Sequence, residues 1–308
     1  MDLKDLEKIY NLPFLELVHK AQIVHLEHFH QNEVQASTLI NIKSGGCVED
    51  CSYCSQSVKN NSKIKIHKLM STEEVYNLAV EAQQNGASRV CLGAAWREIR
   101  DNSDFDTILD MIKAIKSLKM EVCSTLGFVT EEQAMRLSGA GLDYYNHNIE
   151  TSKENYPNIV TTHTFQDRLD TLEIARKAGM KLCSGGIIGM GETVEDRLSM
   201  ILSLASMNPP PNSIPVNALI PMQGTPLEEE TSTTVWDLVR TIATMRIVIP
   251  KSSIRLSAGR ERLSKEGQAL CFMAGANSVF LGEKLLTTLN QTIAEDKEMF
   301  EVLGLRMK

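Results

Sequence analysis

The sequence predicts an α/β protein, a closed (β/α)8 barrel that follows a helical N-terminal extension. The main observation is a regular alternation of short apolar runs with longer amphipathic segments between residues 37 and 281. Eight β/α units of roughly 30 residues each match the length of a TIM-type barrel. The second observation is a loop rich in glycine and cysteine directly after the first predicted strand, at the barrel end where active sites normally lie. An open, doubly wound sheet is the alternative arrangement of the same units.

The predicted N-terminal extension covers residues 1–36, and the predicted barrel domain covers residues 37–308. Apolar residues repeat at helical spacing between residue 2 and about residue 31, which predicts helix. His25 and His28 share one face of this helix. They indicate either a metal site or a solvated helix with acidic neighbours, and the solvated helix is the favoured interpretation.

The elements of the barrel are predicted from capping residues, turns and apolar runs. Strands are expected at residues 37–42, 89–93, 121–126, 142–149, 181–183, 214–220, 253–256 and 278–281. Helices are expected at residues 71–85, 104–118, 130–139, 165–178, 193–207, 234–247 and 263–273. More than twenty residues without a regular pattern separate the first strand from the first helix. Loops of this length are uncommon unless they bind something.

Composition and charge narrow the class of protein. The 308 residues are 43% hydrophobic, enough for a large core, and no run of eighteen apolar residues predicts a membrane span. The N-terminus has mixed charge without the features of a targeting segment, so a cytoplasmic location is expected. A net charge of −7 with scattered signs argues against a nucleic-acid partner. Seven cysteines in an intracellular chain are expected to serve as ligands, redox groups or core residues rather than disulfides.

Cys47, Cys51 and Cys54 form a C-x3-C-x2-C motif in the long loop. A closed zinc site would need a fourth ligand nearby, and His67 is too distant in sequence to fit well. Three thiolates suit an iron–sulfur cube better and leave one iron free for a ligand that is not protein. We therefore expect a 4Fe–4S cluster, with a zinc site or a purely structural cluster as the alternatives.

A second set of residues is predicted inside the barrel. Cys91, Cys123, Cys183 and Arg255 each occupy the third position of a short predicted strand, so they share one layer if the strands keep a common level. A buried arginine needs an anionic partner. A thiolate-bound 2Fe–2S cluster would be such a partner, and ordinary core packing of the cysteines is the alternative. Cys271 lies in an apolar helix and is expected to be a core residue.

Polar residues in the fourth and sixth predicted strands indicate a binding cavity. Asn146, Asn148 and Glu150 are two positions apart and share one face of a strand. Amides and a carboxylate suit a ribose or a cyclic urea, unless that face is turned to solvent. Asn217 is a lone amide in an apolar run and needs partners if it is buried.

The cysteine motif resembles that of radical S-adenosylmethionine enzymes. The segments at residues 91–96, 144–148, 183–193, 255–261 and 271–277 are similar to the biotin synthase family, and the likeness runs from about residue 37 to residue 288. This resemblance implies conversion of dethiobiotin to biotin by radical insertion of sulfur, the last step of biotin biosynthesis. It also implies S-adenosyl-L-methionine as the source of 5′-deoxyadenosyl radicals and the inner 2Fe–2S cluster, bound by the three inner cysteines and Arg255, as the sulfur donor.

The resemblance further implies roles for individual residues. Tyr53, Asn148, Glu150 and Arg168 would bind the nucleotide, with Tyr53 near the adenine and Arg168 at the methionine carboxylate. The family has Asp where Glu150 stands, so this chain carries the same charge on a longer side chain. The residues expected to bind dethiobiotin are Asn146, Asn217, Thr287 and Thr288.

The implied partners are a one-electron donor such as flavodoxin or ferredoxin, iron–sulfur assembly proteins and a second copy of the chain in a homodimer. Two other functions share some of these features. A radical mutase or metallocofactor maturase would need the outer cysteines but not the inner layer. A structural or carrier iron–sulfur or zinc protein would leave the buried amides unexplained.

Overall fold

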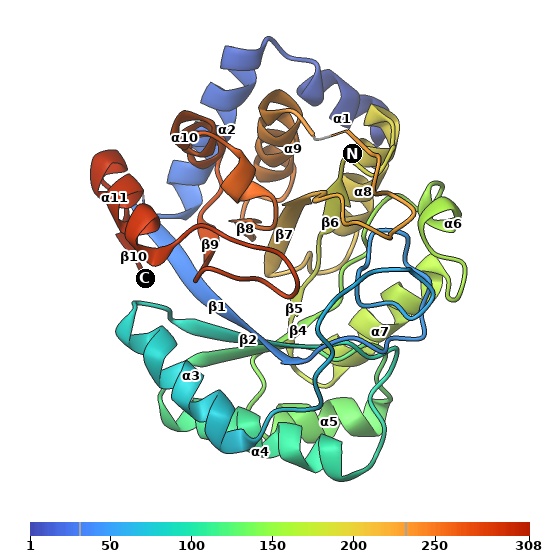
Figure 1. The fold of residues 1–308 in the computed structure, drawn as a ribbon. Coiled ribbons are helices and arrows are strands. Elements are labelled where there is room, and N and C mark those ends of the chain that lie inside the picture. The colour runs from blue at the N-terminus through green and yellow to red at the C-terminus, as the bar shows by residue number, and fades with distance from the viewer. Residues whose placement is uncertain (31, 232) are drawn as a thin grey trace.

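The computed structural model describes residues 1–30, 32–231 and 233–308 and contains a closed parallel barrel (Figure 1). Pairing of the first barrel strand with the last barrel strand closes the barrel. The predicted (β/α)8 fold is therefore confirmed, and the alternative prediction of an open sheet is wrong. One further strand, β6 (Gly186–Ile188), pairs with β7 and continues the wall after β5 ends. The barrel strands in order are β1 (Glu33–Lys43), β2 (Arg89–Ala94), β3 (Glu121–Thr125), β4 (Tyr144–Asn146), β5 (Lys181–Cys183), β7 (Ser213–Ala218), β8 (Ser253–Leu256) and β9 (Ser278–Leu281).

Helices surround the barrel, as Figure 1 shows. Ser71, Thr130, Thr164 and Thr193 each cap a helix N-terminus, where the side chain accepts from the third helical amide and the third residue returns the bond. The seven predicted helices are confirmed to within a few residues. They are α3 (Thr72–Gln84), α4 (Ser103–Ser117), α5 (Glu131–Gly139), α7 (Phe165–Lys177), α8 (Val194–Ala205), α9 (Val235–Val248) and α10 (Lys265–Met273).

The N-terminal segment forms two helices, α1 (Leu3–Tyr10) and α2 (Phe14–His28). Pro13 separates them, because proline lacks the amide hydrogen that a continuous helix needs. Both helices pack against α9 outside the barrel. His25 is buried and stacked on Phe29, so the expectation of a fully solvated helix is wrong for this residue. Residue 31 of the predicted extension lies outside the described residues.

Two strands differ most from their predicted bounds, and the chain adds elements after the last predicted strand. β1 begins at Glu33 rather than residue 37, because Val34 and Ala36 also alternate into the core. The strand expected at residues 142–149 is only β4, and Glu150 has φ of 67°, which is incompatible with an extended strand. After β9 the chain adds α11 (Ile293–Leu303) and β10 (Arg306–Met307), and β10 pairs with the start of β1. The remaining short elements are α6 (Tyr156–Ile159) and the 3-10 turn η1 (Arg260–Arg262).

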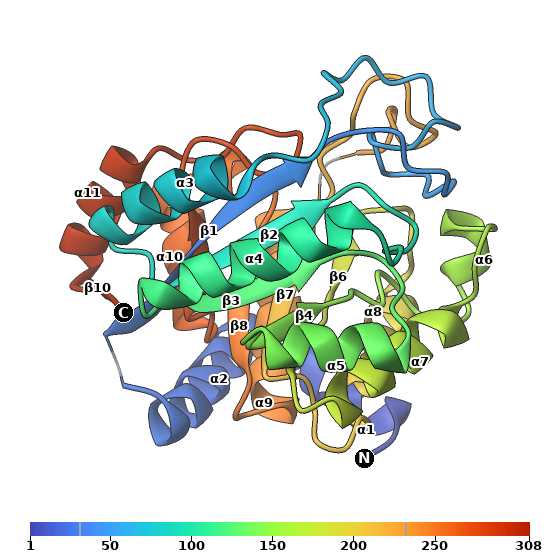
Figure 2. The same cartoon turned by 90° about the horizontal axis from the view of Figure 1, so that it is seen from below.

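Two long loops extend beyond the ends of the strands, as Figure 2 shows for the blue and orange segments. The blue segment follows β1 and the orange segment follows β7. They contact each other directly, because the Asn61 amide donates to the Gly224 carbonyl at 2.8 Å. Within the described ranges, no helix is both long enough and apolar enough to cross a membrane.

Candidate functional site

A cavity of about 310 Å³ occupies the barrel interior on the side of these loops. Three predicted site residues do not line it, namely Cys47, Cys51 and Arg168. The remaining predicted residues all do, so segments far apart in sequence meet around one space. They are Tyr53, Cys54, Cys91, Cys123, Asn146, Asn148, Glu150, Cys183, Asn217, Arg255, Thr287 and Thr288.

The cysteine loop (residues 44–57) holds the outer three thiols in a tight fold. The Cys47 amide donates to the Gln56 carbonyl at 3.1 Å, and the Cys54 amide donates to the Cys51 carbonyl at 3.0 Å. Gly45 and Gly46 have φ of 71° and 78°, a region in which other residues are strained. The local turn thus places three free thiols in one short segment.

The outer thiols fit an iron–sulfur cube better than a single ion. Burial raises the pKa of Cys51 and Cys54, for Cys54 to about 11, and the neighbouring thiols raise both pKa values further. Such thiols become thiolates readily only when a metal binds them. Three ligands without a fourth match a 4Fe–4S cluster with one open iron.

The inner cysteines meet in one layer of the barrel. Cys91 and Cys123 are register partners on β2 and β3, and Cys183 lies opposite Asn146 on β5 and β4. All three side chains are buried and share a cluster with Tyr144. A hydrogen bond with the Cys123 thiol lowers the pKa of both Cys91 and Cys183, and the nearby Arg255 lowers both pKa values further. Cys91 and Cys183 are therefore suited to bind a metal group as thiolates, whereas the hydrogen bonds with these two thiols, together with burial, raise the pKa of Cys123.

Arg255 enters the same layer from β8 and is 1% exposed. Its Nε donates to Ser278 Oγ at 3.0 Å, and its Nη2 donates to Ser37 Oγ at 3.0 Å and to Gln35 Oε1 at 3.2 Å. No ion pair of the described residues includes Arg255. A buried guanidinium held only by neutral groups favours an anion beside it. A 2Fe–2S cluster with thiolate ligands fits this requirement.

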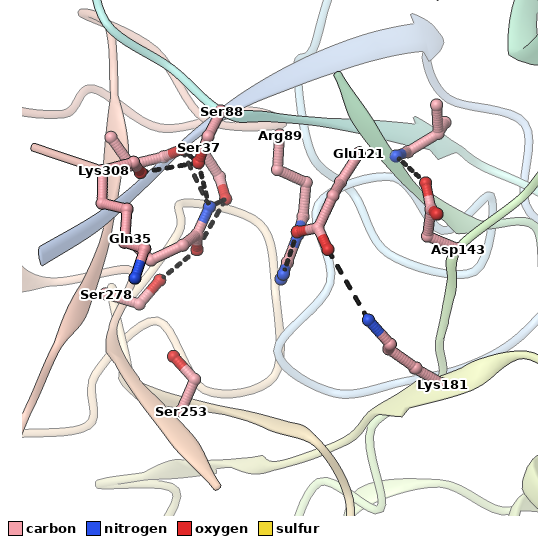
Figure 3. A network of polar contacts seen from close by, with 12 residues as sticks. Gln35, Ser37, Ser88, Arg89, Glu121, Asp143, Lys181, Ser253, Ser278 and Lys308 are labelled. Carbon is pink, nitrogen blue, oxygen red and sulfur yellow. Dashed lines mark hydrogen bonds and ion pairs between the residues drawn. The ribbon is translucent and has the colours of Figure 1, made fainter. Parts of the chain in front are cut away.

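A charged floor lies next to the inner cysteines and was missed by the sequence analysis (Figure 3). Arg89 Nη2 lies 2.6 Å from Glu121 Oε2, and Lys181 Nζ lies 3.7 Å from Glu121 Oε1. The Arg89 guanidinium also stacks on the Tyr144 ring at 3.7 Å. Each of the three charged residues stands two positions before an inner cysteine, so the period of two was the available signal. With Arg255, the floor has an excess of positive charge that suits an anionic group.

Asn146 connects the cysteine layer to the cavity. Its Nδ2 donates to Cys183 Sγ at 3.3 Å, and its Oδ1 accepts from Thr125 Oγ1 at 2.8 Å. Asn148 Oδ1 accepts from the Gly185 amide at 3.2 Å. The sequence analysis missed Thr125, which fixes the orientation of the Asn146 amide.

Glu150 lies after the end of β4, has a left-handed backbone conformation and lines the cavity. Its Oε1 accepts from Arg168 Nη1 at 3.3 Å, whereas its Oε2 is buried without a partner among the described residues. Arg168 also donates to the Asn148 carbonyl at 2.9 Å and contacts Tyr156 Oη. Burial raises the pKa of Glu150, and Arg168 opposes that change. A free buried acceptor beside Tyr53 fits the hydroxyl groups of a ribose.

The far wall comes from the lid loop (residues 282–291) and β7. Ser55 Oγ donates to Thr287 Oγ1 at 3.0 Å and so joins the cysteine loop to the lid loop, a contact that the sequence analysis missed. Thr288 lines the cavity beside Thr287. Asn217 Nδ2 donates to the Gly186 carbonyl at 3.0 Å, and its Oδ1 accepts from the Ala258 amide at 3.3 Å. Cys271 lies outside the site and is fully buried in the core.

Comparisons with known proteins show the family to which this chain belongs. The Radical SAM superfamily model matches residues 41–204, and the Biotin and Thiamin Synthesis associated domain model matches residues 215–306. Biotin synthase of Cytophaga hutchinsonii is 53% identical over 98% of this chain and 90% of its own length. Biotin synthase of Paramagnetospirillum magneticum is 52% identical over 98% of this chain and 93% of its own length.

Solved structures show the same fold at low identity. Methylornithine synthase (PylB) has a TM-score of 0.85 and 19% identity over 100% of this chain and 94% of its own. The FeFe-hydrogenase maturase HydG from Carboxydothermus hydrogenoformans has a TM-score of 0.85 and 18% identity over 100% of this chain and 76% of its own. The identity and coverage of the curated relatives show the family directly. The chain belongs to the biotin synthase family of radical S-adenosylmethionine enzymes.

Proposed function

We propose that this chain converts dethiobiotin to biotin by radical-mediated insertion of sulfur, the last step of biotin biosynthesis. The observation that carries the proposal is the presence of two separate thiol sets around one cavity. Cys54 of the outer set and Cys91, Cys123 and Cys183 of the inner set all line it. A substrate in this cavity would lie between a site that generates a radical and a site that supplies sulfur.

Cys47, Cys51 and Cys54 would hold the 4Fe–4S cluster, and the three inner cysteines with Arg255 would hold the 2Fe–2S cluster. When bound, the outer cluster supplies the electron that cleaves S-adenosylmethionine, and the inner cluster supplies the sulfur atom. The protein contributes binding, orientation and exclusion of water. Leu285 and Leu286 of the lid loop line the cavity and give it an apolar wall, which suits radical chemistry at an unactivated carbon.

The polar residues divide between nucleotide and substrate. Glu150 Oε2 is available to accept from ribose hydroxyls, with Tyr53 and Asn148 beside it. Arg168 lies behind Glu150 and positions its carboxylate, in addition to the proposed interaction with the methionine carboxylate. The residues proposed to bind dethiobiotin are Asn146 and Asn217 at the ureido ring and Thr287 and Thr288 at the carboxylate tail.

Other radical enzymes with this barrel are the nearest alternative. PylB and HydG share the fold, but identities of 19% and 18% support no shared reaction. A mutase or maturase has no need for three inner thiols beside a buried arginine. A structural or carrier role would leave the buried Oε2 of Glu150 without a function.

The proposed reaction requires further partners. One-electron reduction needs a donor such as flavodoxin or ferredoxin, and a cluster consumed as a reagent must be rebuilt by iron–sulfur assembly proteins. We also propose a homodimer in the cytoplasm. The proposed domain organisation is a helical extension, predicted at residues 1–36, followed by a barrel domain, predicted at residues 37–308. Strand β1 begins within the predicted extension, at Glu33.

Anaerobic product analysis tests the proposal. The protein is reconstituted with iron and sulfide, reduced with dithionite and incubated with S-adenosylmethionine and dethiobiotin. Biotin together with 5′-deoxyadenosine is the expected result. Deoxyadenosine without biotin would favour another radical reaction, and neither product from protein with both clusters would favour a structural role.

A further inference from the structure

The loop that follows the cysteine loop carries an unusual charge for this protein. This basic loop (residues 58–68) contains Lys59, Lys63, Lys65 and Lys68 and no Asp or Glu, although the whole chain has a net charge of −7. All four lysines are exposed. No ion pair of the described residues includes any of them. Their charge is therefore available to a partner.

The basic loop is bonded directly to the three outer cysteines. Asn60 Nδ2 donates to the Cys51 carbonyl at 3.0 Å and to the Cys54 carbonyl at 2.8 Å. The Val58 amide donates to the Cys47 carbonyl at 2.8 Å. Hydrogen bonds thus link the outer surface of the basic loop to each residue proposed to hold the 4Fe–4S cluster.

Apolar side chains lie among these lysines. Val48 is 55% exposed, Val58 is 60% exposed and Ile66 is 68% exposed. Ile66 also contacts the cysteine loop, because its Cγ1 lies close to Gly45. Exposed apolar groups beside unpaired charges are typical of a surface that binds another protein.

We propose that this basic face, formed by Val48, Val58, Lys59, Lys63, Lys65 and Ile66, docks an acidic one-electron carrier protein. The inference rests on the proposed function, which requires reduction of the outer cluster. The carrier is oxidised by one electron and the cluster is reduced by one electron. Electron-transfer encounters use small interfaces, and complementary charge raises their association rates.

The neighbouring loop after β7 carries three acidic residues that could pair with the lysines, namely Glu228, Glu229 and Glu230. Glu228 Oε2 instead accepts from the Gly224 amide at 2.6 Å, and Glu230 lies close to Gly191. Glu229 is exposed and belongs to no ion pair of the described residues. These glutamates leave the basic face uncompensated, and charge complementarity favours an acidic occupant. A symmetric contact between two copies through this face would bring the lysines of both copies together, and like-charge repulsion disfavours such a contact.

The test compares two double variants of equal charge change. Lys63→Glu with Lys65→Glu reverses charge on the basic face. Lys177→Glu with Lys251→Glu reverses two exposed lysines that precede β5 and β8 at the opposite end of the barrel. Reoxidation of a reduced, acidic flavodoxin by the cluster-loaded protein is followed by stopped-flow absorbance at several salt concentrations. Binding of oxidised flavodoxin is measured separately by calorimetry, which requires no turnover.

The basic-face variant is expected to lose at least about tenfold in the second-order rate at low salt and to show a weaker salt dependence. Its nucleotide cleavage with dithionite should equal that of the wild type. Equal losses in both variants, or unchanged flavodoxin rates and binding in the basic-face variant, would overturn the docking site. Failure of the wild type to cleave the nucleotide with dithionite would instead contradict the proposed function.

Discussion

Replacement of Glu150 by Gln tests the nucleotide site most directly. Oε1 is occupied by Arg168, so only the buried Oε2 is free to accept from a ribose hydroxyl. One hydrogen bond to a charged group contributes about 1.5–3 kcal/mol, and about 1.4 kcal/mol corresponds to a tenfold change in affinity. We therefore expect Glu150→Gln to weaken S-adenosylmethionine binding about tenfold to a hundredfold. Equilibrium dialysis of the nucleotide with oxidised, cluster-loaded protein measures this without cleavage.

Glu150→Asp provides the matched control. Aspartate keeps the negative charge and tolerates the left-handed conformation at this position better than most residues. We expect it to retain most of the affinity. Arg168 keeps its bonds to the Asn148 carbonyl and to Tyr156 in both variants, so both should bind clusters normally. Wild-type affinity in Glu150→Gln would refute the reasoning, and equal losses in both variants would indicate that side-chain length matters as much as charge.

Three further predictions concern the clusters, the core and the pH dependence of stability. Cys47→Ala is expected to abolish 5′-deoxyadenosine formation, whereas Cys183→Ala should still form 5′-deoxyadenosine but no biotin. Mass spectrometry of the products distinguishes the two results. Biotin from both variants would contradict the two-cluster assignment. Arg260 lies 2.6 Å from Asp296, and both side chains are 0% exposed. Asp296→Ala therefore leaves Arg260 as an unpaired buried charge. The free energy of unfolding should fall by about 3–5 kcal/mol in denaturant titrations, and a loss below about 1 kcal/mol would show that Arg260 finds other partners. Burial and Arg246 lower the pKa of His25 to about 4, so between pH 6.5 and about 4 the unfolded chain binds a proton that the folded chain does not. Unfolding free energy should therefore decrease from pH 7 to pH 5, and His25→Gln should show a smaller decrease in the same titrations.

The alternation of strands and helices was predictable because local signals agree with the fold. Capping boxes at Ser71, Thr130 and Thr193 mark helix starts that the structure reproduces. The common third position of the inner cysteines predicted that they share one layer, and strands of a barrel do keep such a regular register. The same period of two could have placed Arg89 on the inner face of its strand, but this signal was missed because an arginine at a strand start is equally typical of an exposed end.

Features that depend on distant contacts could not be predicted. The left-handed conformation of Glu150 has no local cause, because glutamate does not favour positive φ; its carbonyl accepts from the Ile187 amide at 2.8 Å and holds it there. The bond between Ser55 and Thr287 joins segments 232 positions apart. In the sequence, the basic loop resembles an ordinary polar connection. Only the structure shows that Asn60 donates to two cysteine carbonyls.

The two ends of the cavity differ in ways that match their proposed roles. The outer cysteines lie in a loop that is hydrogen-bonded to the exposed, basic loop at residues 58–68, so an electron carrier on the basic loop can approach them without entering the cavity. Each inner cysteine lies two positions after a member of the floor of Arg89, Glu121 and Lys181, whose charges form ion pairs (Figure 3). A substrate radical formed between the two ends would face apolar side chains, bound amides and the inner layer. Exclusion of water from this space by bound nucleotide and substrate would leave sulfur transfer from the inner layer as the favoured fate of that radical.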